Sequence, residues 1–331
     1  MAPKISVVLP TYNVADYISE AMDSLLEQPV PLHEIIIVDD GCTDGTLAVL
    51  QERYSDRPEI RIISQKNQGV GAARHNGLAV ASGDFIFFCD PDDVVSPDLF
   101  STFIAQYRAN ADIELFYFSK RSFIDDAGAR RLQRRNTAAS REGWFKNGSA
   151  LFENLMLIDK YHAATWQYIF RRQVCERFTV ELEGRVHEDH LFSINVYLNS
   201  QLTYASFADL YFYRERTGSL TQSHKDAVYV TDSYEAYRKT LAVLKRHLKS
   251  FEDPRAVALK FMERNVNALL TKCVKYRVQP PSVLTRLTWQ DARDCDVPLY
   301  SRWTILCPQG AYQMRRVRYK LRKRVKQTRR S

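Results

Sequence analysis

Three short apolar segments in the first hundred residues each run directly into a polar cluster. The clusters share carboxylates, hydroxyls and one aromatic ring, and they are Pro10-Thr-Tyr-Asn13, Asp39-Asp40-Gly41 and Asp90-Pro-Asp-Asp93. Five carboxylates around one cleft repel one another unless a cation binds among them or a ligand donates hydrogen bonds to them. Hard divalent ions such as Mg²⁺ and Mn²⁺ prefer carboxylate oxygens, and substrate phosphates often complete their coordination. The clusters therefore predict a cation site, with solvated acids that cap the following helices as the alternative.

The elements that must position these clusters alternate between strand and helix patterns. Continuous apolar runs predict buried strands at Ile5–Leu9, Glu34–Val38, Ile60–Ile63, Phe85–Cys89 and Ile113–Phe118. Between them, apolar residues at spacings of three and four predict helices. Further strands are predicted at Thr165–Phe170, Leu202–Ala205 and Leu210–Arg214, and helices from Asp226 to about Tyr276 with a break near Pro254. Strands joined by helical crossovers indicate an α/β fold with a mostly parallel sheet and helices on both faces. Ligands of such sheets bind beyond the carboxyl ends of the strands, which is where the three polar clusters lie.

A Gly- and Ala-rich segment, Gly69–Gly77, opens one of the predicted helices. The N-terminus of this helix could bind a phosphate. Arg74, within the segment, could pair with a diphosphate or stack near a base. The alternative, which the residues leave open, is that the small side chains allow the helix to pack closely on the sheet.

These segments occur together and in the order known from one enzyme family. The segments that resemble motifs of the family 2 glycosyltransferases are Ile5–Asn13, Ile36–Thr46, Asn67–Gly77 and Gly83–Asp93. The resemblance is dense up to residue 120 and thin from there to residue 225. Cys42 stands where the family usually has Ser, and His75 where it often has Asn. Neither departure removes a chemical group on which the family relies.

The resemblance implies a GT-A fold, a nucleotide-diphosphate sugar as donor and inversion at the anomeric carbon. The donor-binding residues that it implies in this part of the chain are Pro10, Thr11, Tyr12, Asp39, Asp40, Gln68, Arg74 and Asp90. Thr11 and Tyr12 would hold the base of the nucleotide, together with Asp39 or Asp40. Arg74 would lie near the base or the diphosphate.

The resemblance also implies a divalent metal, Mn²⁺ or Mg²⁺, as cofactor. Asp92 would bind the metal, and Asp90 would bind the ribose, a metal-bound water or the metal itself.

Inversion requires a general base that takes the proton of the acceptor hydroxyl. Glu188-Asp189 resembles the acidic pair that opens a helix in this family, so Asp189 is the predicted base and Glu188 would orient or bind the acceptor. The alternative is that both acids only favour a helix N-terminus through the dipole. His162, His187 and His190 could form a metal cluster, but contacts around the acceptor fit them better because the Asp-rich site already supplies a metal position.

Tyr211–Ser219 resembles a segment that lies late in the catalytic domain of capsule, lipopolysaccharide and teichoic-acid members of the family. The cations of this segment, Arg214 and Arg216, could stabilise the departing diphosphate. Arg214 and Ser219 are the preferred donor-binding residues. The alternative is an edge strand with solvated arginines. Trp166 lies in a segment that also resembles such members; it could stack on a sugar, but a buried core tryptophan is the preferred interpretation.

The net charge of +8 comes from the C-terminal end of the chain. Residues 311–331 hold ten of the 47 basic residues and no acid, which leaves 37 basic and 39 acidic residues in positions 1–310. A nucleic-acid partner is therefore not expected. Apolar residues recur at helical spacing among these cations, at Met314, Val317, Leu321 and Val325. This pattern predicts a basic amphipathic helix on an anionic membrane surface, with a helical connection to a further domain as the alternative.

A second basic group lies in the predicted loop or loose hairpin of residues 125–143 and consists of Arg130, Arg131, Arg134 and Arg135. A solvated loop is the preferred interpretation, and a contact with a phosphate-bearing acceptor is the alternative. No apolar run reaches the ~20 residues of a membrane span, and we expect no secretory signal. Six scattered cysteines without a Cys-x-x-Cys pair fit a reducing cytosol.

The sequence thus predicts an inverting, metal-dependent glycosyltransferase, cytoplasmic and peripheral at the inner face of the cell membrane. It would move a sugar, from UDP in the commonest case, to a hydroxyl of a cell-envelope glycan, teichoic-acid-type polymer or lipid-linked acceptor. Residues 1–225 would form the catalytic domain, 226–310 a helical region and 311–331 the basic tail. One alternative is a non-catalytic nucleotide-sugar-binding module. Another is a sugar nucleotidyltransferase, which needs a Gly-rich N-terminal loop that residues 10–13 do not provide.

Overall fold

The computed structural model describes residues 2–126, 129–133, 141–182, 187–216, 227–279, 284–297, 307–308 and 310–315. The chain divides into two compact units, one of Met1–Phe152 with His162–Ser223 and the other of Glu153–Tyr161 with His224–Ser331. Ser219, Arg134, Arg135 and residues 316–331 lie outside the described residues. The predictions for Ser219, for two of the four loop arginines and for most of the amphipathic tail therefore concern parts of the chain that the structure does not describe.

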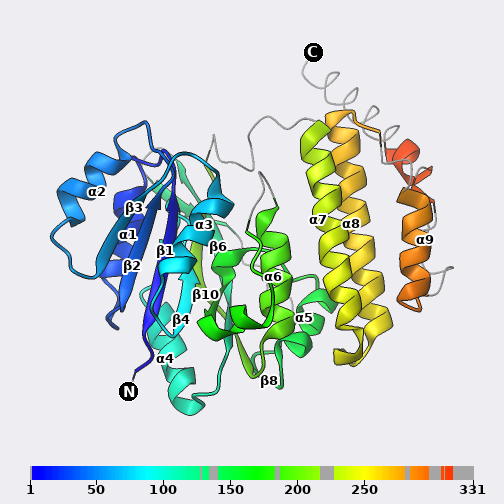
Figure 1. The fold of residues 1–331 in the computed structure, drawn as a ribbon, viewed down its shortest axis with the longest axis horizontal. Coiled ribbons are helices and arrows are strands. Elements are labelled where there is room, and N and C mark those ends of the chain that lie inside the picture. The colour runs from blue at the N-terminus through cyan, green and yellow to red at the C-terminus, as the bar shows by residue number, and fades with distance from the viewer. Residues whose placement is uncertain are drawn as a thin grey trace. The chain divides into compact units, whose positions relative to one another are not determined.

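The first unit is built on one twisted sheet (Figure 1). Its strands, within the described residues, are β1 Ile5–Thr11, β2 Glu34–Asp39, β3 Ile60–Ser64, β4 Phe85–Phe88, β5 Val94–Val95, β6 Leu115–Asp126, β7 Ala129–Leu132, β8 Gly143–Phe145, β9 Tyr168–Arg171 and β10 Thr203–Arg214. They lie in the order β3-β2-β1-β4-β9-β6-β10-β5, with β7 on β6 and β8 on β10. β9 runs antiparallel to both of its neighbours, and the neighbouring pairs among β1–β4 and the pair β6–β10 are parallel. The carboxyl ends of β1, β2, β4, β6 and β10 therefore meet at one edge. The predicted α/β sheet is confirmed, but it is mixed rather than mostly parallel, because β5, β7, β8 and β9 run antiparallel to their neighbours.

Helices cover both faces of this sheet because successive strand residues point to opposite faces. The helices of the unit are α1 Ile18–Leu26, α2 Thr46–Tyr54, α3 Val70–Val80, α4 Leu99–Ala109 and α6 Glu188–Asn199, together with the first half of α5 Gly148–Leu157, whose second half belongs to the other unit. In β4, the ring of Phe87 packs against Phe100 of α4 at 5.7 Å, and the ring of the next residue, Phe88, packs against Phe192 of α6 at 5.7 Å. One buried strand thus ties a helix layer to each face.

Helix α3 packs directly on β1 and β2. A Cβ atom at Gly77 would lie 2.3 Å from Cγ1 of Val8 and 3.1 Å from Cγ2 of Val38. The close-packing interpretation of the small-residue helix is therefore confirmed at this position.

We expect Gly77→Ala to destabilise the protein by about 1–3 kcal/mol, because the added methyl group overpacks the contact with Val8. Chemical denaturation measures this change. Gly45→Ala is the matched control, since the nearest atom to its new Cβ is 3.9 Å away. Equal stability of the two variants would contradict the expectation.

Two elements differ from the prediction, and a third agrees with it. The two short strands expected at Leu202–Ala205 and Leu210–Arg214 are one strand, β10, whose register against β6 shifts on both sides of Asp209. Such bulges break the regular pattern that marks a single strand in sequence. The strand expected at Thr165–Phe170 begins as a 3-10 turn, Thr165–Gln167, before β9. The loose hairpin expected after Asp125 has a described part, in which β6 continues to Asp126 and pairs with β7.

The second unit is helical in its described residues. It contains α7 Ala227–Arg246, α8 Pro254–Tyr276 and α9 Leu284–Asp294, with a 3-10 turn at Leu248–Ser250. The predicted break near Pro254 is confirmed: the Asp253 side chain accepts a hydrogen bond from the N–H of Ala256 at 2.9 Å and caps α8. Helix α9 lies inside the region predicted to be helical, residues 226–310, but its own bounds were not predicted. Its Asp291 is 1% exposed and pairs with Lys245 of α7 at 2.8 Å and with Arg238.

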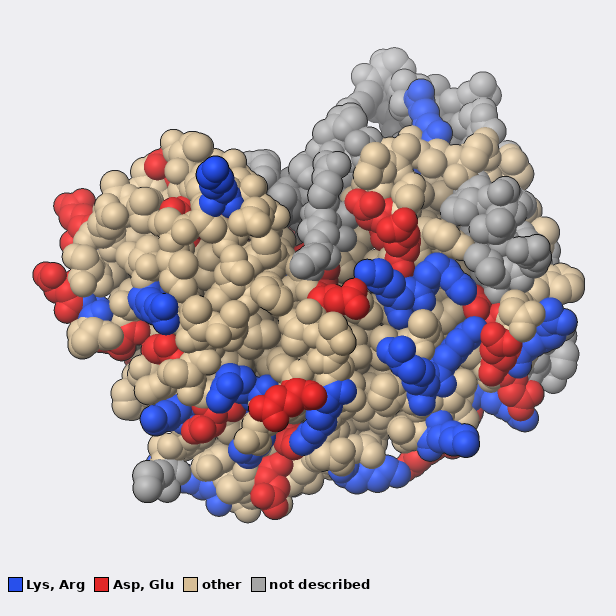
Figure 2. Space-filling model, in the orientation of Figure 1, with Lys and Arg blue, Asp and Glu red and all other residues tan. Residues whose placement is uncertain are grey.

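Figure 2 shows acidic and basic side chains on both units on the face in view. No helix in the described part of the chain is long and apolar enough to cross a membrane.

Candidate active site

The first wall of the site is formed by the ends of β1 and β2. Asp40 is buried and accepts hydrogen bonds at 2.8 Å from the backbone N–H groups of Gln68 and Gly69 and from Nε2 of Gln65. Both carboxylate oxygens of Asp40 therefore hold the loop that leads into α3. Asp39 accepts one hydrogen bond, from the N–H of Cys42 at 2.8 Å. Asp39 and Asp40, the two alternatives for binding the nucleotide base, thus have different surroundings.

The residues after β1 sit beside these acids. Thr11 is buried and donates to the carbonyl of Leu9 at 3.2 Å, whereas the ring of Tyr12 is 46% exposed. Sγ of Cys42 accepts from the N–H of Asn13 at 3.3 Å. Burial, together with the Asp39 carboxylate, raises the pKa of the Cys42 thiol to about 12, so this cysteine is a neutral packing group rather than a nucleophile.

Arg74 joins the two acidic motifs of the site. Its side chain projects from α3, is 6% exposed, and donates from NH1 to Oε1 of Glu188 at 2.8 Å and from NH2 to Oδ1 of Asp90 at 2.9 Å. Burial disfavours the charged guanidinium, but the Asp90 and Glu188 carboxylates outweigh it and raise the pKa of Arg74. Glu188 is 114 positions from Arg74 in the chain, so only the tertiary fold brings the motifs together.

The acidic pair Glu188-Asp189 opens α6, as predicted for a helix N-terminus. Burial raises the pKa of Glu188, and the Arg74 guanidinium offsets part of the rise. Burial also raises the pKa of Asp189 to about 6, with an offset from Arg74 and a further rise from the Asp90 carboxylate. The Asp189 side chain is 31% exposed. A carboxylate with a pKa near neutrality that still reaches solvent suits a general base.

The loop after β4 is fixed by Asp93. Asp93 is 1% exposed and accepts from the hydroxyl of Tyr211 and from the N–H of Arg214, both at 2.7 Å. The same Tyr211 oxygen accepts from the N–H of Asp90 at 3.1 Å. Burial and the Asp90 and Asp92 carboxylates raise the pKa of Asp93 well above its usual range. Asp93 therefore ties the loop to β10 and is engaged by the protein itself.

Asp90 and Asp92 present oxygen ligands that fit a hard divalent ion. Burial raises the pKa of Asp90; Arg74 offsets part of this rise, and the Asp92 carboxylate adds to it. A divalent cation beside the pair would favour the charged form of both groups. The donor set thus fits Mg²⁺ or Mn²⁺.

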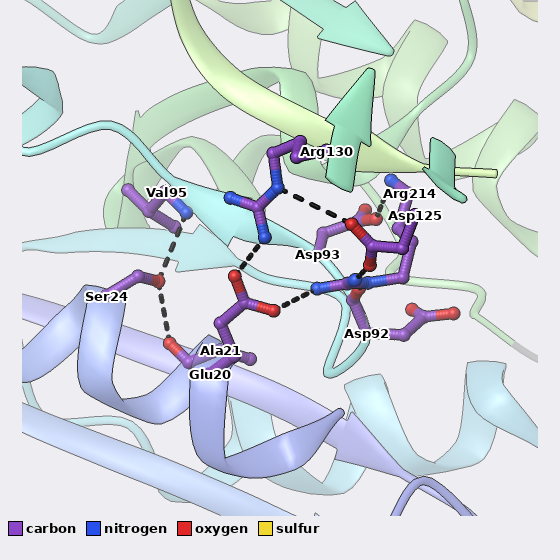
Figure 3. A network of polar contacts seen from close by, with 9 residues as sticks. All are labelled: Glu20, Ala21, Ser24, Asp92, Asp93, Val95, Asp125, Arg130 and Arg214. Atoms are coloured by element: carbon purple, nitrogen blue, oxygen red, sulfur yellow. Dashed lines mark hydrogen bonds and ion pairs between the residues drawn. The ribbon is translucent and has the colours of Figure 1, made fainter. Parts of the chain in front are cut away.

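Two arginines at the end of β10 contact the same loop. Nε of Arg216 donates to Oδ2 of Asp92 at 2.6 Å, and Nε of Arg214 donates to the carbonyl of Asp92 at 2.7 Å. Arg214 is 4% exposed and forms ion pairs with Glu20 of α1 and Asp125 of β6. Figure 3 shows this network, in which Arg130 also pairs with Glu20. These protein acceptors surround the Arg214 guanidinium, and its predicted contact with the donor diphosphate stays a prediction.

Comparison with known proteins places this chain in a family. The model of the family described as "Glycosyl transferase family 2" matches residues 6–178, more than half of the 331-residue chain. The chain belongs to glycosyl transferase family 2. The match includes every site residue described above up to Asp93, but it ends before Glu188, Asp189, Arg214 and Arg216.

Relatives and solved structures agree with this assignment. A chondroitin synthase of Escherichia coli is 36% identical over 126 residues, which are 38% of this chain and only 18% of that enzyme. Residues 1–349 of Staphylococcus aureus TarS, solved in complex with UDP-GlcNAc, share the fold with a TM-score of 0.68 and 22% identity over 89% of this chain and 82% of that one. A mannosyltransferase of Pyrobaculum calidifontis, solved with GDP-Man and Mn²⁺, gives a TM-score of 0.51 and 15% identity over 97% of this chain and 88% of that one. The fold of this family 2 member is GT-A, as expected.

Among the other predicted side chains of the family 2 member, Trp166 lies in the core, and His187 and His190 lie beside Asp189. Trp166 is 8% exposed and stacks on Tyr211 at 4.6 Å between ring centroids, so the core interpretation is confirmed. His187, Asp189 and His190 form a group whose potential metal-ligand atoms lie within 4.8 Å of one another, and His162 is not part of it.

Sequence reasoning did not single out Tyr211, Glu20 or Asp125. Alternation along β10 offers a weak signal for Tyr211 as an inward-facing residue. Glu20 and Asp125 carry no local signal, because their roles arise from ion pairs with a residue far along the chain.

Proposed function

We propose that this protein is an inverting glycosyltransferase that uses a nucleotide-diphosphate sugar. The single observation that carries the proposal is the bridge that Arg74 makes between Asp90 and Glu188. It holds an acidic loop suited to a metal and a diphosphate beside a carboxylate, Asp189, suited to proton abstraction. Transfer with inversion needs these two functions on one site.

The donor would lie along the carboxyl edge of β1, β2 and β4. Thr11 and the exposed ring of Tyr12 would contact the base, with Asp39 as the preferred acid because Asp40 is engaged by the loop before α3. Pro10 and Gln68 would line the same part of the site. UDP is the first nucleotide to test, since the TarS neighbour was solved with UDP-GlcNAc.

Asp92 would hold the divalent ion, with Asp90 binding either the ion or the ribose. Bound there, the ion would supply positive charge for the leaving diphosphate. The Mn²⁺ in the mannosyltransferase complex supports Mn²⁺ as the first metal to test. Ser219 and Arg214 remain proposed donor contacts.

Glu188 would orient the acceptor hydroxyl, and Asp189 would take its proton. The acceptor would be a hydroxyl of a cell-envelope glycan, a teichoic-acid-type polymer or a lipid-linked sugar. The likeness to a chondroitin synthase supports a polysaccharide acceptor. The basic end of the chain would bind an anionic membrane surface, which would place the enzyme at the inner face of the cell membrane.

A donor screen tests the proposal. The full chain is incubated with a panel of nucleotide sugars and Mn²⁺, and release of the free nucleotide is measured together with thermal stabilisation. We expect one donor to be turned over. A chain that binds a nucleotide sugar and never turns it over, with any acceptor, would favour the non-catalytic module instead.

We expect Asp92→Ala to weaken metal-dependent binding of that donor by at least about 10- to 100-fold, because a proposed metal ligand is lost. Calorimetry with and without Mn²⁺ measures the change. Asp56→Ala, which removes an exposed carboxylate, is the control. An unchanged donor affinity of Asp92→Ala would remove Asp92 from the site.

The activity should depend on pH through Asp189. The base works only when ionised, and its pKa is about 6. We therefore expect kcat/KM to be constant above this value and to fall about tenfold per pH unit below it. A rate profile from pH 5 to pH 8 tests this, and a profile that rises toward acid would contradict it.

A further inference from the structure

Arg216 and Asp92 form an ion pair at the proposed metal position. Nε of Arg216 lies 2.6 Å from Oδ2 of Asp92, and the two side chains are 21% and 19% exposed. The guanidinium also lies over the ring of Tyr17 at 4.9 Å. The carboxylate that best suits a metal thus has a cation from the end of β10 as its counter-ion.

The neighbouring arginine is held much more firmly. Arg214 donates from its backbone to Asp93, from Nε to the carbonyl of Asp92, and pairs with Glu20 and Asp125. The rings of Tyr17 and Phe123 flank it at 5.2 Å and 4.6 Å. These contacts hold the end of β10 in place. Arg216 follows this end by two residues, so its side chain can change partner without moving β10.

A guanidinium and a divalent cation compete for one carboxylate. Binding of the metal alone at Asp92 would have to break the ion pair and leave two cations close together, which is unfavourable. A diphosphate changes this balance, because its oxygens accept the planar fork of an arginine at least as well as a carboxylate does. Metal binding then separates Arg216 from Asp92 while Arg216 gains a new anionic partner.

We propose that Arg216 is a donor-site residue that makes metal binding at Asp92 conditional on a nucleoside diphosphate. Arg216 exchanges the Asp92 carboxylate for oxygens of the diphosphate when the metal binds. This inference rests on the proposed function, specifically on Asp92 as a metal ligand. The site would then bind metal and diphosphate together more tightly than either one alone. Such a coupling between two ligands usually changes the affinity about 5- to 150-fold.

Titration with Mn²⁺ tests the inference without measuring catalysis. Free Mn²⁺ is followed by electron paramagnetic resonance in the full chain, with Mn²⁺ alone, with UDP and with UMP. The same titrations without protein are subtracted, because UDP itself binds Mn²⁺ in solution. In the unmodified protein we expect UDP, and not UMP, to raise the affinity for Mn²⁺. In Arg216→Gln we expect the affinity for Mn²⁺ alone to rise about 5- to 150-fold. The UDP effect should shrink by a similar factor, because only the direct coordination of the metal by the diphosphate remains.

Three further variants separate the outcomes. Arg216→Lys keeps the cation and should bind Mn²⁺ alone nearly as weakly as the unmodified protein. Arg57→Gln removes a surface cation that pairs with Glu59 at 3.5 Å and should change nothing. Asp92→Asn should abolish the UDP-dependent binding of Mn²⁺, and thermal unfolding verifies that each variant is folded.

The results distinguish the inference from the proposed function. If Asp92→Asn binds Mn²⁺ as the unmodified protein does, the metal assignment in the proposed function fails. If Asp92→Asn loses binding but Arg216→Gln leaves the affinity for Mn²⁺ alone and the UDP effect unchanged, the metal assignment stands and the role of Arg216 is refuted. An equal effect of UMP and UDP would also refute it.

Discussion

Replacing Asp189 by asparagine should lower kcat by about 10²- to 10⁴-fold, because asparagine cannot accept the proton of the acceptor hydroxyl. The side chain keeps its size and loses only its ability to ionise. Asp189 has the pKa of about 6 that a base near neutral pH requires, and it opens α6 next to Glu188, which Arg74 holds. Steady-state transfer with the donor found by the screen measures the loss.

Binding measurements show whether the loss of activity lies in the chemical step or in binding of the donor and the metal. The affinities of Asp189→Asn for the donor and for Mn²⁺ should stay within about threefold of those of the unmodified protein. A general base that acts only in the chemical step contributes to kcat and not to ground-state binding. Asp56→Asn, an exposed acid, is the matched control and should be fully active. Normal transfer by Asp189→Asn would show that another group acts as base.

Replacing Arg74 by methionine should lower the free energy of unfolding by about 3–5 kcal/mol, because it removes one partner of a buried ion network and leaves two carboxylates uncompensated. Asp90 and Glu188 both lose their cationic partner, and burial already raises the pKa of each. Donor binding should weaken as well, since Arg74 holds Asp90 in place. Urea denaturation and calorimetry measure the two effects.

The pH dependence of this destabilisation has a definite sign. Without Arg74 the pKa of Glu188 in the folded protein rises further above its value in the unfolded chain, so the folded protein binds the proton more strongly. The loss of stability should therefore be largest at neutral pH and should shrink as the pH falls toward 5. Arg74→Met combined with Glu188→Gln should recover part of the loss at neutral pH.

An exposed ion pair provides the control for the stability loss expected of Arg74→Met. Arg53 pairs with Asp23 at 3.2 Å, with side chains 45% and 41% exposed. Arg53→Met should change stability by less than about 1 kcal/mol, as is usual for exposed pairs. If Arg74→Met were as mild as Arg53→Met, the network of Arg74, Asp90 and Glu188 would not hold the site together.

Local patterns determined most of the first 120 residues. The apolar runs of β1, β2 and β4 were recognisable because buried parallel strands are continuously hydrophobic. The polar clusters at their ends were predicted to converge because parallel strands place their carboxyl ends at one edge. Asp39, Asp40, Asp90 and Asp92 do lie at the ends of β2 and β4 on that edge.

Longer-range structure was harder to predict for a physical reason. β10 was divided in two because its bulges interrupt the alternation of side chains. The helical region was predicted, but α9 was not delimited within it because its segment is polar and lies between prolines. The difference between Asp39 and Asp40 also depends on the fold, since the donors to Asp40 come from a loop that begins 25 positions later.

The sequence by itself determined the family, the α/β class and the acidic residues at the strand ends, because each depends on residue types within a short window. Only the tertiary structure decided which of these residues act on one another. Arg74 meets Glu188 across 114 positions, and Arg216 meets Asp92 across 124. An ion pair between such distant residues leaves no trace in local periodicity, because its geometry is set by the packing of α3, α6 and β10 around a common edge of the sheet.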